Sequence, residues 1–149
     1  MTLYLVQHGD ALSKDQDPER PLSDKGRHDV RAMSAFLAAS GVRVARVIHS
    51  GKARARDTAL LLSQGIGPGD VAKCDIGLAP NDPTGPLKTL VESWDDDVMV
   101  VGHLPFMGRM VADLAGAVAF EPATVVALEK DEDGNWTLQW MLRPSLLGV

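Results

Sequence analysis

Short apolar runs alternate along the chain with longer segments whose apolar residues recur every three or four positions. The short runs predict β-strands, and the periodic segments predict amphipathic helices. The predicted strands cover residues 2–6, 44–48, 71–74, 97–101, 124–129 and 136–142. One predicted helix begins after Ser23, a suitable N-cap, and ends at Gly41, and the others cover residues 52–64, 87–94 and 106–114.

Strands that alternate with helices are typical of α/β folds, in which helices cover both faces of a mostly parallel sheet. We predict a three-layer α/β/α sandwich that comprises residues 1–149 as a single domain. Asp133-Gly134 between the last two strands is a hairpin signal, so these strands are predicted to form an antiparallel C-terminal edge. The glycines at 65–69 are interpreted as a break between elements.

Charge and cysteine content exclude several classes of partner. The chain has 20 Asp and Glu against 15 Lys and Arg, a net charge of -5, which argues against general binding to a nucleic-acid backbone. The single cysteine, Cys74, excludes an internal disulfide and a cysteine-rich zinc site. No apolar run approaches about 20 residues, and the N-terminus does not resemble a signal peptide. We therefore expect a cytoplasmic protein without membrane contact, either a monomer or a weak dimer.

Polar side chains follow three predicted strands, at the edge of a parallel sheet where ligands bind. His8 follows the first strand, Ser50 and Arg54 follow the second, and His103 follows the fourth, while Arg20 lies on the first loop. Arginine matches the geometry of phosphate oxygens, and a neutral histidine can attack phosphorus in line. The pattern therefore predicts a phosphate site that needs no metal or cofactor. Zinc is the competing interpretation, but no close histidine or cysteine pair supports it.

Five short motifs follow one another along nearly the whole chain. They are Gln7-His8-Gly9-Asp10-Ala11, Arg20-Pro21-Leu22-Ser23 with Gly26, Ser50-x-x-x-Arg54-Ala55-x-x-Thr58, Leu78-x-Pro80, and Val101-Gly102-His103-Leu104-Pro105. In this order and spacing they resemble the histidine phosphatase superfamily, whose fold is phosphoglycerate mutase-like. The resemblance is to its short branch, the SixA-like phosphohistidine phosphatases.

The resemblance implies a role for each residue of the predicted phosphate pocket. His8 is the nucleophile that becomes transiently phosphorylated, with Gly9 beside it. Arg54 and His103 contact the phosphoryl oxygens, and Arg20 is a further ligand of the phosphate or of the substrate. The implied function is a phosphatase in signal transduction that removes phosphate from phosphohistidine on a partner protein.

The general acid is the least defined part of the resemblance. Larger relatives protonate the leaving oxygen with an acidic residue from an inserted segment, which this chain lacks. Asp10 and Asp82 are the candidates that remain. A phosphoramidate tolerates the loss, because an imidazole leaving group needs less acid assistance than an alkoxide. A small-molecule phosphomonoesterase, which needs that acid, stays open as an alternative.

Gln7 is the departure from the family pattern, which has arginine immediately before the nucleophilic histidine. Glutamine offers amide donors to the phosphate but no charge. Losing a donor that stabilises the transition state typically costs a factor of about 10²–10³ in rate. A second hypothesis is therefore a degenerate domain that binds phosphate or phosphohistidine with little turnover.

Overall fold

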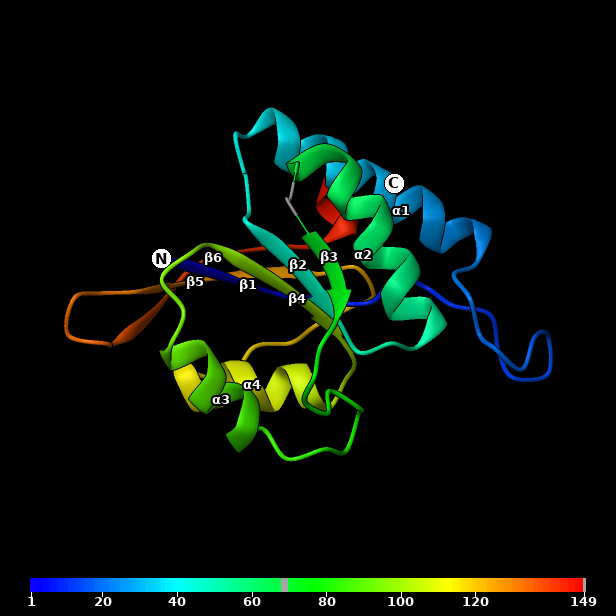
Figure 1. The fold of residues 1–149 in the computed structure, drawn as a ribbon. Helices are drawn as coiled ribbons and strands as arrows, with labels where there is room; N and C mark the ends of the chain where they lie inside the picture. Colours follow the sequence, from blue (N-terminus) through cyan, green and yellow to red (C-terminus); the bar gives the residue numbers. More distant parts are fainter. Residues whose placement is uncertain (68–69, 149) are drawn as a thin grey trace.

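The computed structural model describes residues 1–67 and 70–148, and its elements follow the predicted order (Figure 1). The strands are β1 (Thr2–Gln7), β2 (Arg46–His49), β3 (Asp70–Lys73), β4 (Val98–Gly102), β5 (Val125–Lys130) and β6 (Trp136–Leu142). The helices are α1 (Asp24–Ala39), α2 (Ala53–Ile66), α3 (Gly85–Glu92), α4 (Phe106–Leu114) and the 3₁₀ helix η1 (Pro144–Leu147). Each predicted element is present with its ends shifted by at most about two residues. Only η1, which is too short for periodicity, was not predicted.

The six strands form one mixed sheet in the order β3-β2-β4-β1-β5-β6. β1, β2, β3 and β4 pair in parallel, while β5 and β6 continue the sheet in antiparallel fashion through the predicted hairpin. The predicted α/β class, the mostly parallel sheet and the antiparallel C-terminal edge are therefore confirmed. β1 and β4 lie next to each other at the centre, and their carboxyl ends point to the same edge.

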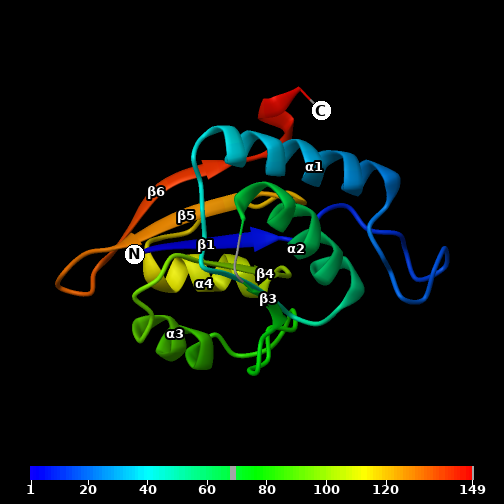
Figure 2. The ribbon, with the colours of Figure 1, turned by 45° about the horizontal axis from the view of Figure 1, so that its top comes forward.

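Helices cover both faces of the sheet, which gives the three predicted layers (Figures 1 and 2). α1 and α2 pack on one face, over a core that includes Tyr4 and Val6 of β1. α3 and α4 pack on the other face, where Leu3 and Leu5 are buried. Successive residues of β1 thus point to opposite cores, as strand geometry requires. Over the described ranges, no helix has the length and apolar character needed to cross a bilayer.

The two central strands also mark the point where the chain connections diverge. The segment after β1 forms α1 on one face, and the segment after β4 forms α4 on the other. In open α/β sheets such a switch point leaves a crevice beyond the carboxyl ends of the strands, and ligands bind there. The fold therefore places the residues after β1 and β4 at the expected ligand site.

The break predicted at residues 65–69 begins at Gly67 and not at Gly65. The helix continues through Gly65 to Ile66 and ends at Gly67, which adopts the left-handed conformation. A Cβ at position 65 would lie 2.5 Å from the carbonyl oxygen of Ser34 in α1. Gly65 thus allows α1 and α2 to approach closely. Of the predicted break, positions 68 and 69 lie outside the described residues.

Candidate active site

The ends of β1 and β4 bring His8 and His103 together. The two strands pair in parallel up to Gln7 and Gly102, and the His8 N–H then donates to the Gly102 carbonyl at 3.0 Å. The two imidazole rings lie 5.1 Å apart between centroids, tilted by 57°. The sequence placed both residues at strand ends, and the parallel register makes them neighbours.

The His8 ring is held in one tautomer. Its Nδ1 lies 2.7 Å from the carbonyl oxygen of Gly9, and because a carbonyl only accepts, Nδ1 carries the proton and donates. Nε2 consequently keeps its lone pair. This is the arrangement that a nucleophilic imidazole requires.

His103 is almost fully buried, with 1% of its surface exposed. Its Nε2 lies 2.6 Å from Oγ of Ser50, the first residue after β2. Its Nδ1 is buried and has no hydrogen-bond partner among the described residues. Ser50 therefore orients a ring whose other nitrogen has its hydrogen-bonding capacity unused.

Both histidines are neutral at physiological pH. The pKa of His8 is lowered to about 4, mainly by burial and also by the charges of Arg54 and Arg20, against the opposing effects of the Gly9 carbonyl and Asp10. Burial also lowers the pKa of His103 to about 3, together with His8, Arg54, Lys52 and Arg20. The site is thus an electropositive region with uncharged imidazoles, which suits an incoming oxyanion and a nucleophilic nitrogen.

Arg54 lies in the first turn of α2, and its position is tied to the His8 loop through Thr58. The Thr58 hydroxyl donates to the Arg54 carbonyl at 2.8 Å and accepts from the Gly9 N–H at 3.0 Å. Arg54 Nε is buried without a partner among the described residues. Burial and the nearby charge of Arg20 lower the pKa of Arg54. An anion that contacts both guanidiniums would relieve this repulsion.

Arg20 reaches the site from the loop between β1 and α1. Its backbone adopts a left-handed conformation, with φ of 48°, and its Nε donates to the Leu12 carbonyl at 2.9 Å. The charge of Arg20 lowers the pKa values of both site histidines and of Arg54. A non-glycine residue with positive φ is uncommon and often occurs at a functional site. The structure therefore groups Arg20 with the predicted pocket.

Gln7 is buried, with 7% of its surface exposed. Its Nε2 lies 3.4 Å from His8 Nε2, and its Oε1 has no partner among the described residues. Its backbone is fixed by the segment before β5, where Ala123 donates to the carbonyls of Gln7 and His8. The Gln7 amide thus lies beside the His8 nitrogen that keeps its lone pair.

Both candidate acids already accept hydrogen bonds. Asp10 Oδ2 accepts from the Ser23 hydroxyl at 2.5 Å, at the start of α1. Asp82 Oδ2 accepts from the Ala79 N–H at 2.9 Å, and so closes the turn before α3. Asp10 is near enough to affect His8, whereas Asp82 lines a neighbouring cavity together with Ser50 and Lys52.

Ser50 was grouped with the predicted site but given no role, and Thr58 was not predicted as a site residue, although both belong to the same sequence motif. Each uses a hydroxyl to hold a residue that comes from another strand. Their spacing from Arg54 was the signal that the sequence offered. Their partners, His103 for Ser50 and Gly9 for Thr58, follow β4 and β1 and are brought near by the sheet. His49 is a buried residue whose Nδ1 accepts from the Gly51 N–H at 3.1 Å.

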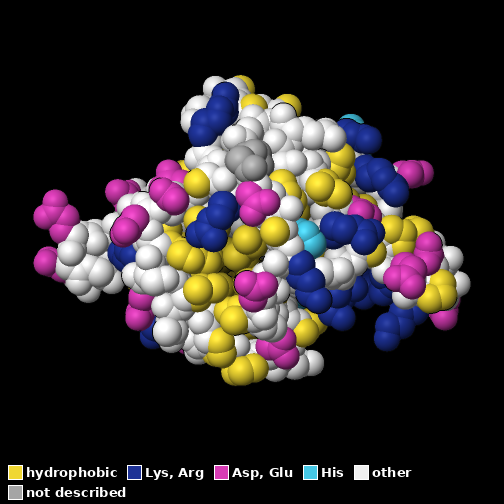
Figure 3. Space-filling model, viewed as in Figure 1, with side chains coloured by type: hydrophobic (Ala, Val, Ile, Leu, Met, Phe, Trp, Pro, Cys, Tyr) yellow, Lys and Arg dark blue, Asp and Glu magenta, His cyan; other side chains and the backbone are white. Residues whose placement is uncertain are grey.

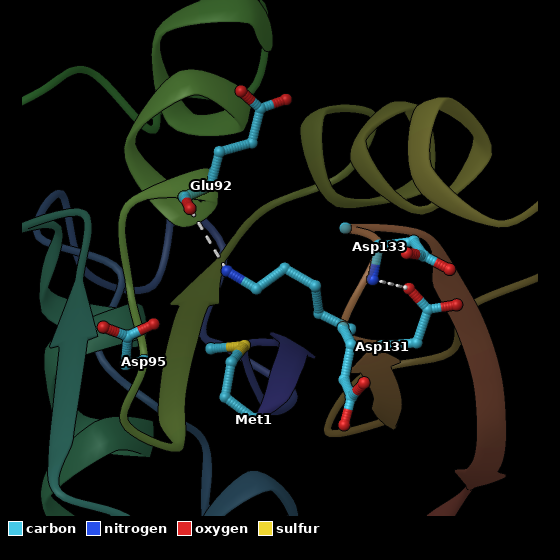
Figure 4. Close-up of a pocket in the computed structure, with 8 residues that line it drawn as sticks. Met1, Glu92, Asp95, Asp131 and Asp133 are labelled. Atoms are coloured by element: carbon cyan, nitrogen blue, oxygen red, sulfur yellow. Dashed lines mark hydrogen bonds between the residues drawn. The ribbon is translucent and has the colours of Figure 1, made fainter.

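A cavity of about 620 Å³ lies near the N-terminal end of β1, at the opposite end of the strand from His8 (Figure 4). Carboxylate residues Glu92, Asp95, Asp131 and Asp133 line it together with Met1. Lys130 Nζ donates to the carbonyls of Glu92 and Trp94, and is held there. Within residues 1–67 and 70–148, no three His, Cys, Asp or Glu side chains group closely enough to hold a metal ion.

The chain is similar to several known proteins. A sequence model of the histidine phosphatase superfamily (branch 1) matches residues 3–76. The phosphohistidine phosphatase SixA of Escherichia coli is 28% identical over 97% of this chain and 94% of that protein. An uncharacterized protein of Picosynechococcus sp. is 31% identical over 80% of this chain and 74% of its own length. A structure of the protein histidine phosphatase SixA complexed with tungstate has a TM-score of 0.89, with 28% identity and 99% of each chain covered.

Proposed function

Since the chain belongs to the histidine phosphatase superfamily, in its SixA-like branch, we propose that it is a metal-independent phosphohistidine phosphatase. Its proposed substrate is phosphohistidine on a partner protein, and His8 is the proposed nucleophile. The observation that carries the proposal is the His8 ring, whose Nδ1 donates to the Gly9 carbonyl and leaves Nε2 with its lone pair. That a 28% identical relative binds tungstate, an oxyanion, also supports the proposal.

In the first step, His8 Nε2 attacks phosphorus in line and forms a phosphoimidazole, while the bond to the leaving nitrogen breaks. The Gly9 carbonyl stabilises the positive charge that develops on the His8 ring through its bond to Nδ1. Arg54 and Arg20 balance the charge of the phosphoryl oxygens. When the Ser50 hydroxyl donates to His103 Nε2, His103 Nδ1 carries a proton and serves as a further donor.

In the second step, water attacks phosphorus, the bond from phosphorus to His8 Nε2 breaks, and His8 leaves as a neutral ring while the water protons remain on the released phosphate. The imidazole leaving group of the first step needs less acid assistance than an alkoxide does. This suits a site in which Asp10 and Asp82 already accept hydrogen bonds from Ser23 and Ala79. The same feature disfavours the small-molecule phosphomonoesterase.

Gln7 favours a second candidate function, a domain that binds phosphohistidine with little turnover. Its amide lies beside His8 Nε2, where it can donate to a phosphoryl oxygen, but it adds no charge. An arginine there would supply a charged donor, for which the typical gain is a factor of about 10²–10³ in rate. The two functions differ in whether Arg20 and Arg54 provide enough positive charge without it.

The test measures hydrolysis of phosphoramidate and of free phosphohistidine by the wild type, His8→Ala and Gln7→Arg. We expect turnover by the wild type, and a radiolabelled, acid-labile phosphate on His8 during the reaction. His8→Ala should abolish both signals. A metal chelator should leave the wild-type rate unchanged.

The Gln7→Arg variant separates the two functions. A wild-type rate equal to or above that of Gln7→Arg rules out the degenerate domain. A wild type that binds vanadate but turns over only after Gln7→Arg rules out the phosphatase. Robust wild-type activity that survives in His8→Ala contradicts the proposed nucleophile.

A further inference from the structure

Three exposed basic side chains surround the outer part of the site: Lys14, Lys52 and Arg56, here called the basic rim. Together with Arg20 and Arg54 they line a cavity of about 410 Å³. Arg20 and Arg54 are half-buried in it, whereas the side chains of the rim are exposed. Figure 3 shows Lys and Arg side chains gathered around a histidine on this face.

The rim carries more positive charge than one phosphoryl group needs. A phosphoryl group brings about two negative charges at neutral pH. In the proposed mechanism, Arg20 and Arg54 balance these charges from within the pocket. The rim adds three further cations, in a chain whose net charge is -5. The surplus points to further negative charges on the substrate itself.

Two of these cations, Lys52 and Arg56, lie at the start of α2, where positive charge does not stabilise the helix. Lys52 is the N-cap of α2 and its side chain makes no capping hydrogen bond, and the first turn contains no acidic residue. The N-terminus of a helix favours anions and disfavours cations. Placing Lys52 and Arg56 there works against the helix, so an external anion is the partner that fits them.

Carboxylates within the chain leave most of this charge uncompensated. Within the described residues, neither Lys14 nor Lys52 has a carboxylate oxygen within 4.0 Å, and Arg56 Nη2 lies 3.6 Å from Asp57 Oδ1. The loop that carries Lys14 also carries Asp15, Asp17 and Glu19. Of these acids, only Glu19 lines the cavity.

We propose that the basic rim docks an acidic segment of the phosphohistidine-bearing partner protein, so that carboxylates next to the phosphohistidine contact Lys14, Lys52 and Arg56. The inference rests on the proposed function and specifies its substrate class. Long, exposed side chains from two separate elements suit several carboxylates along a protein segment. Complementary charge of this kind gives specificity and a faster encounter.

The test compares two fluorescein-labelled peptides that contain a non-hydrolysable phosphohistidine analogue, phosphoryl-triazolylalanine. One peptide carries Glu and Asp on both sides of the analogue, and the other carries Gln and Asn. We expect the acidic peptide to bind at least about tenfold more tightly at low salt. The preference should shrink as ionic strength rises, because exposed charges are screened.

A double variant identifies the surface responsible. Lys14→Glu with Arg56→Glu should remove the acidic preference, and Lys52 is left intact because it acts on the pKa of His103. The matched control, Arg31→Glu with Lys88→Glu, makes the same change in net charge on α1 and α3 and should keep the preference. Both double variants should hydrolyse phosphoramidate within about twofold of the wild-type rate.

Three outcomes separate this inference from the proposed function. Equal binding of the two peptides overturns the inference. Rim-dependent competition by inorganic pyrophosphate, without an acidic peptide preference, also overturns it and assigns the rim to a second phosphate. A rim-dependent acidic preference in a protein that hydrolyses neither phosphoramidate nor free phosphohistidine supports the docking surface and rejects the phosphatase.

Discussion

The N-termini of α1 and α2 are both tied to the loop that carries His8, yet they are built in opposite ways. α1 begins with Ser23, whose hydroxyl accepts from the Gly26 N–H and donates to Asp10, and Asp24 follows in its first turn. α2 begins with Lys52, has no side-chain cap, and places Arg54 in its first turn. The first terminus is capped within the chain, whereas the second has neither a side-chain cap nor an acidic residue in its first turn.

The two helix starts therefore have different roles: the start of α1 supports the His8 loop, and the start of α2 adds positive charge to the site. The capped start of α1 fixes the backbone just after His8, because Asp10 lies directly against Gly26 and Ser23. The uncapped start of α2 adds its dipole to the charges that face the histidines. Changes at α1 should therefore act on stability first, and changes at α2 should act on activity first.

Arg54→Ala is expected to give the largest effect, a loss of about 10²–10³ in kcat/KM for phosphoramidate, because a donor to the transition state is lost. The melting temperature should stay the same or rise slightly, since a cation leaves a helix N-terminus. Arg27→Ala is the matched change in the first turn of α1, where Arg27 donates to the Leu22 carbonyl. It should keep the activity within a few-fold of wild type; a similar loss in both variants would remove the distinction between the helices.

Gly26→Ala is expected to lower the free energy of unfolding by about 1–3 kcal/mol, as overpacking usually does. A Cβ at this position would lie 2.0 Å from the Asp10 carbonyl oxygen, so the start of α1 has to move. Thermal and urea unfolding measure the change. Gly85→Ala in α3 is the control, because no atom lies within 4 Å of the added Cβ. An unchanged stability of Gly26→Ala would show that α1 does not hold the His8 loop.

Lys52→Gln is expected to give the smallest effect, a rise in the pKa of His103 by a fraction of a unit. Burial is the main reason that this pKa lies at about 3, and the charge of Lys52 contributes less. NMR titration of the ring protons measures the shift. Lys25→Gln in α1 is the control, because Lys25 pairs with Asp29 at 2.6 Å; an equal shift there would assign the effect to net charge alone.

The pKa of His103 also determines how the stability of the fold depends on pH. The pKa of His103 is lower in the folded chain than its ordinary value of 6.5, so below pH 6.5 the unfolded state binds more protons. The contribution of neutral His103 to the free energy of unfolding should therefore be largest above about pH 6.5, and it should decline as the pH falls toward 3. His8 adds a decline of the same sign that ends near pH 4.

Much of the fold and part of the site were predictable because they depend on local pattern. The apolar runs before His8 and His103 end at polar residues, which is the signature of a strand that reaches a ligand-binding edge. The motif spacing also indicated Arg54, whose side chain the structure finds half-buried.

The remaining features depend on contacts between distant elements. The Ser50 bond to His103 joins the loop after β2 to the end of β4, and the Thr58 bond to Gly9 joins α2 to the end of β1. Gly65 looked like a helix end because its contact with Ser34 of α1 cannot be read from local pattern. The opposite design of the two helix starts became visible only once both were seen beside His8.

The central pairing of β1 with β4 also has a consequence for the order of folding. Its first link joins Thr2 to Asp97, which are 95 residues apart in the chain, and β1 pairs on its other side with β5. Contacts of such long sequence separation form late and slow the folding of a domain. During synthesis, His8 emerges early but acquires its neighbour only after β4 has left the ribosome. Catalytic activity in this chain is therefore a measure of completed folding, and N-terminal fragments that end before β4 are expected to lack it.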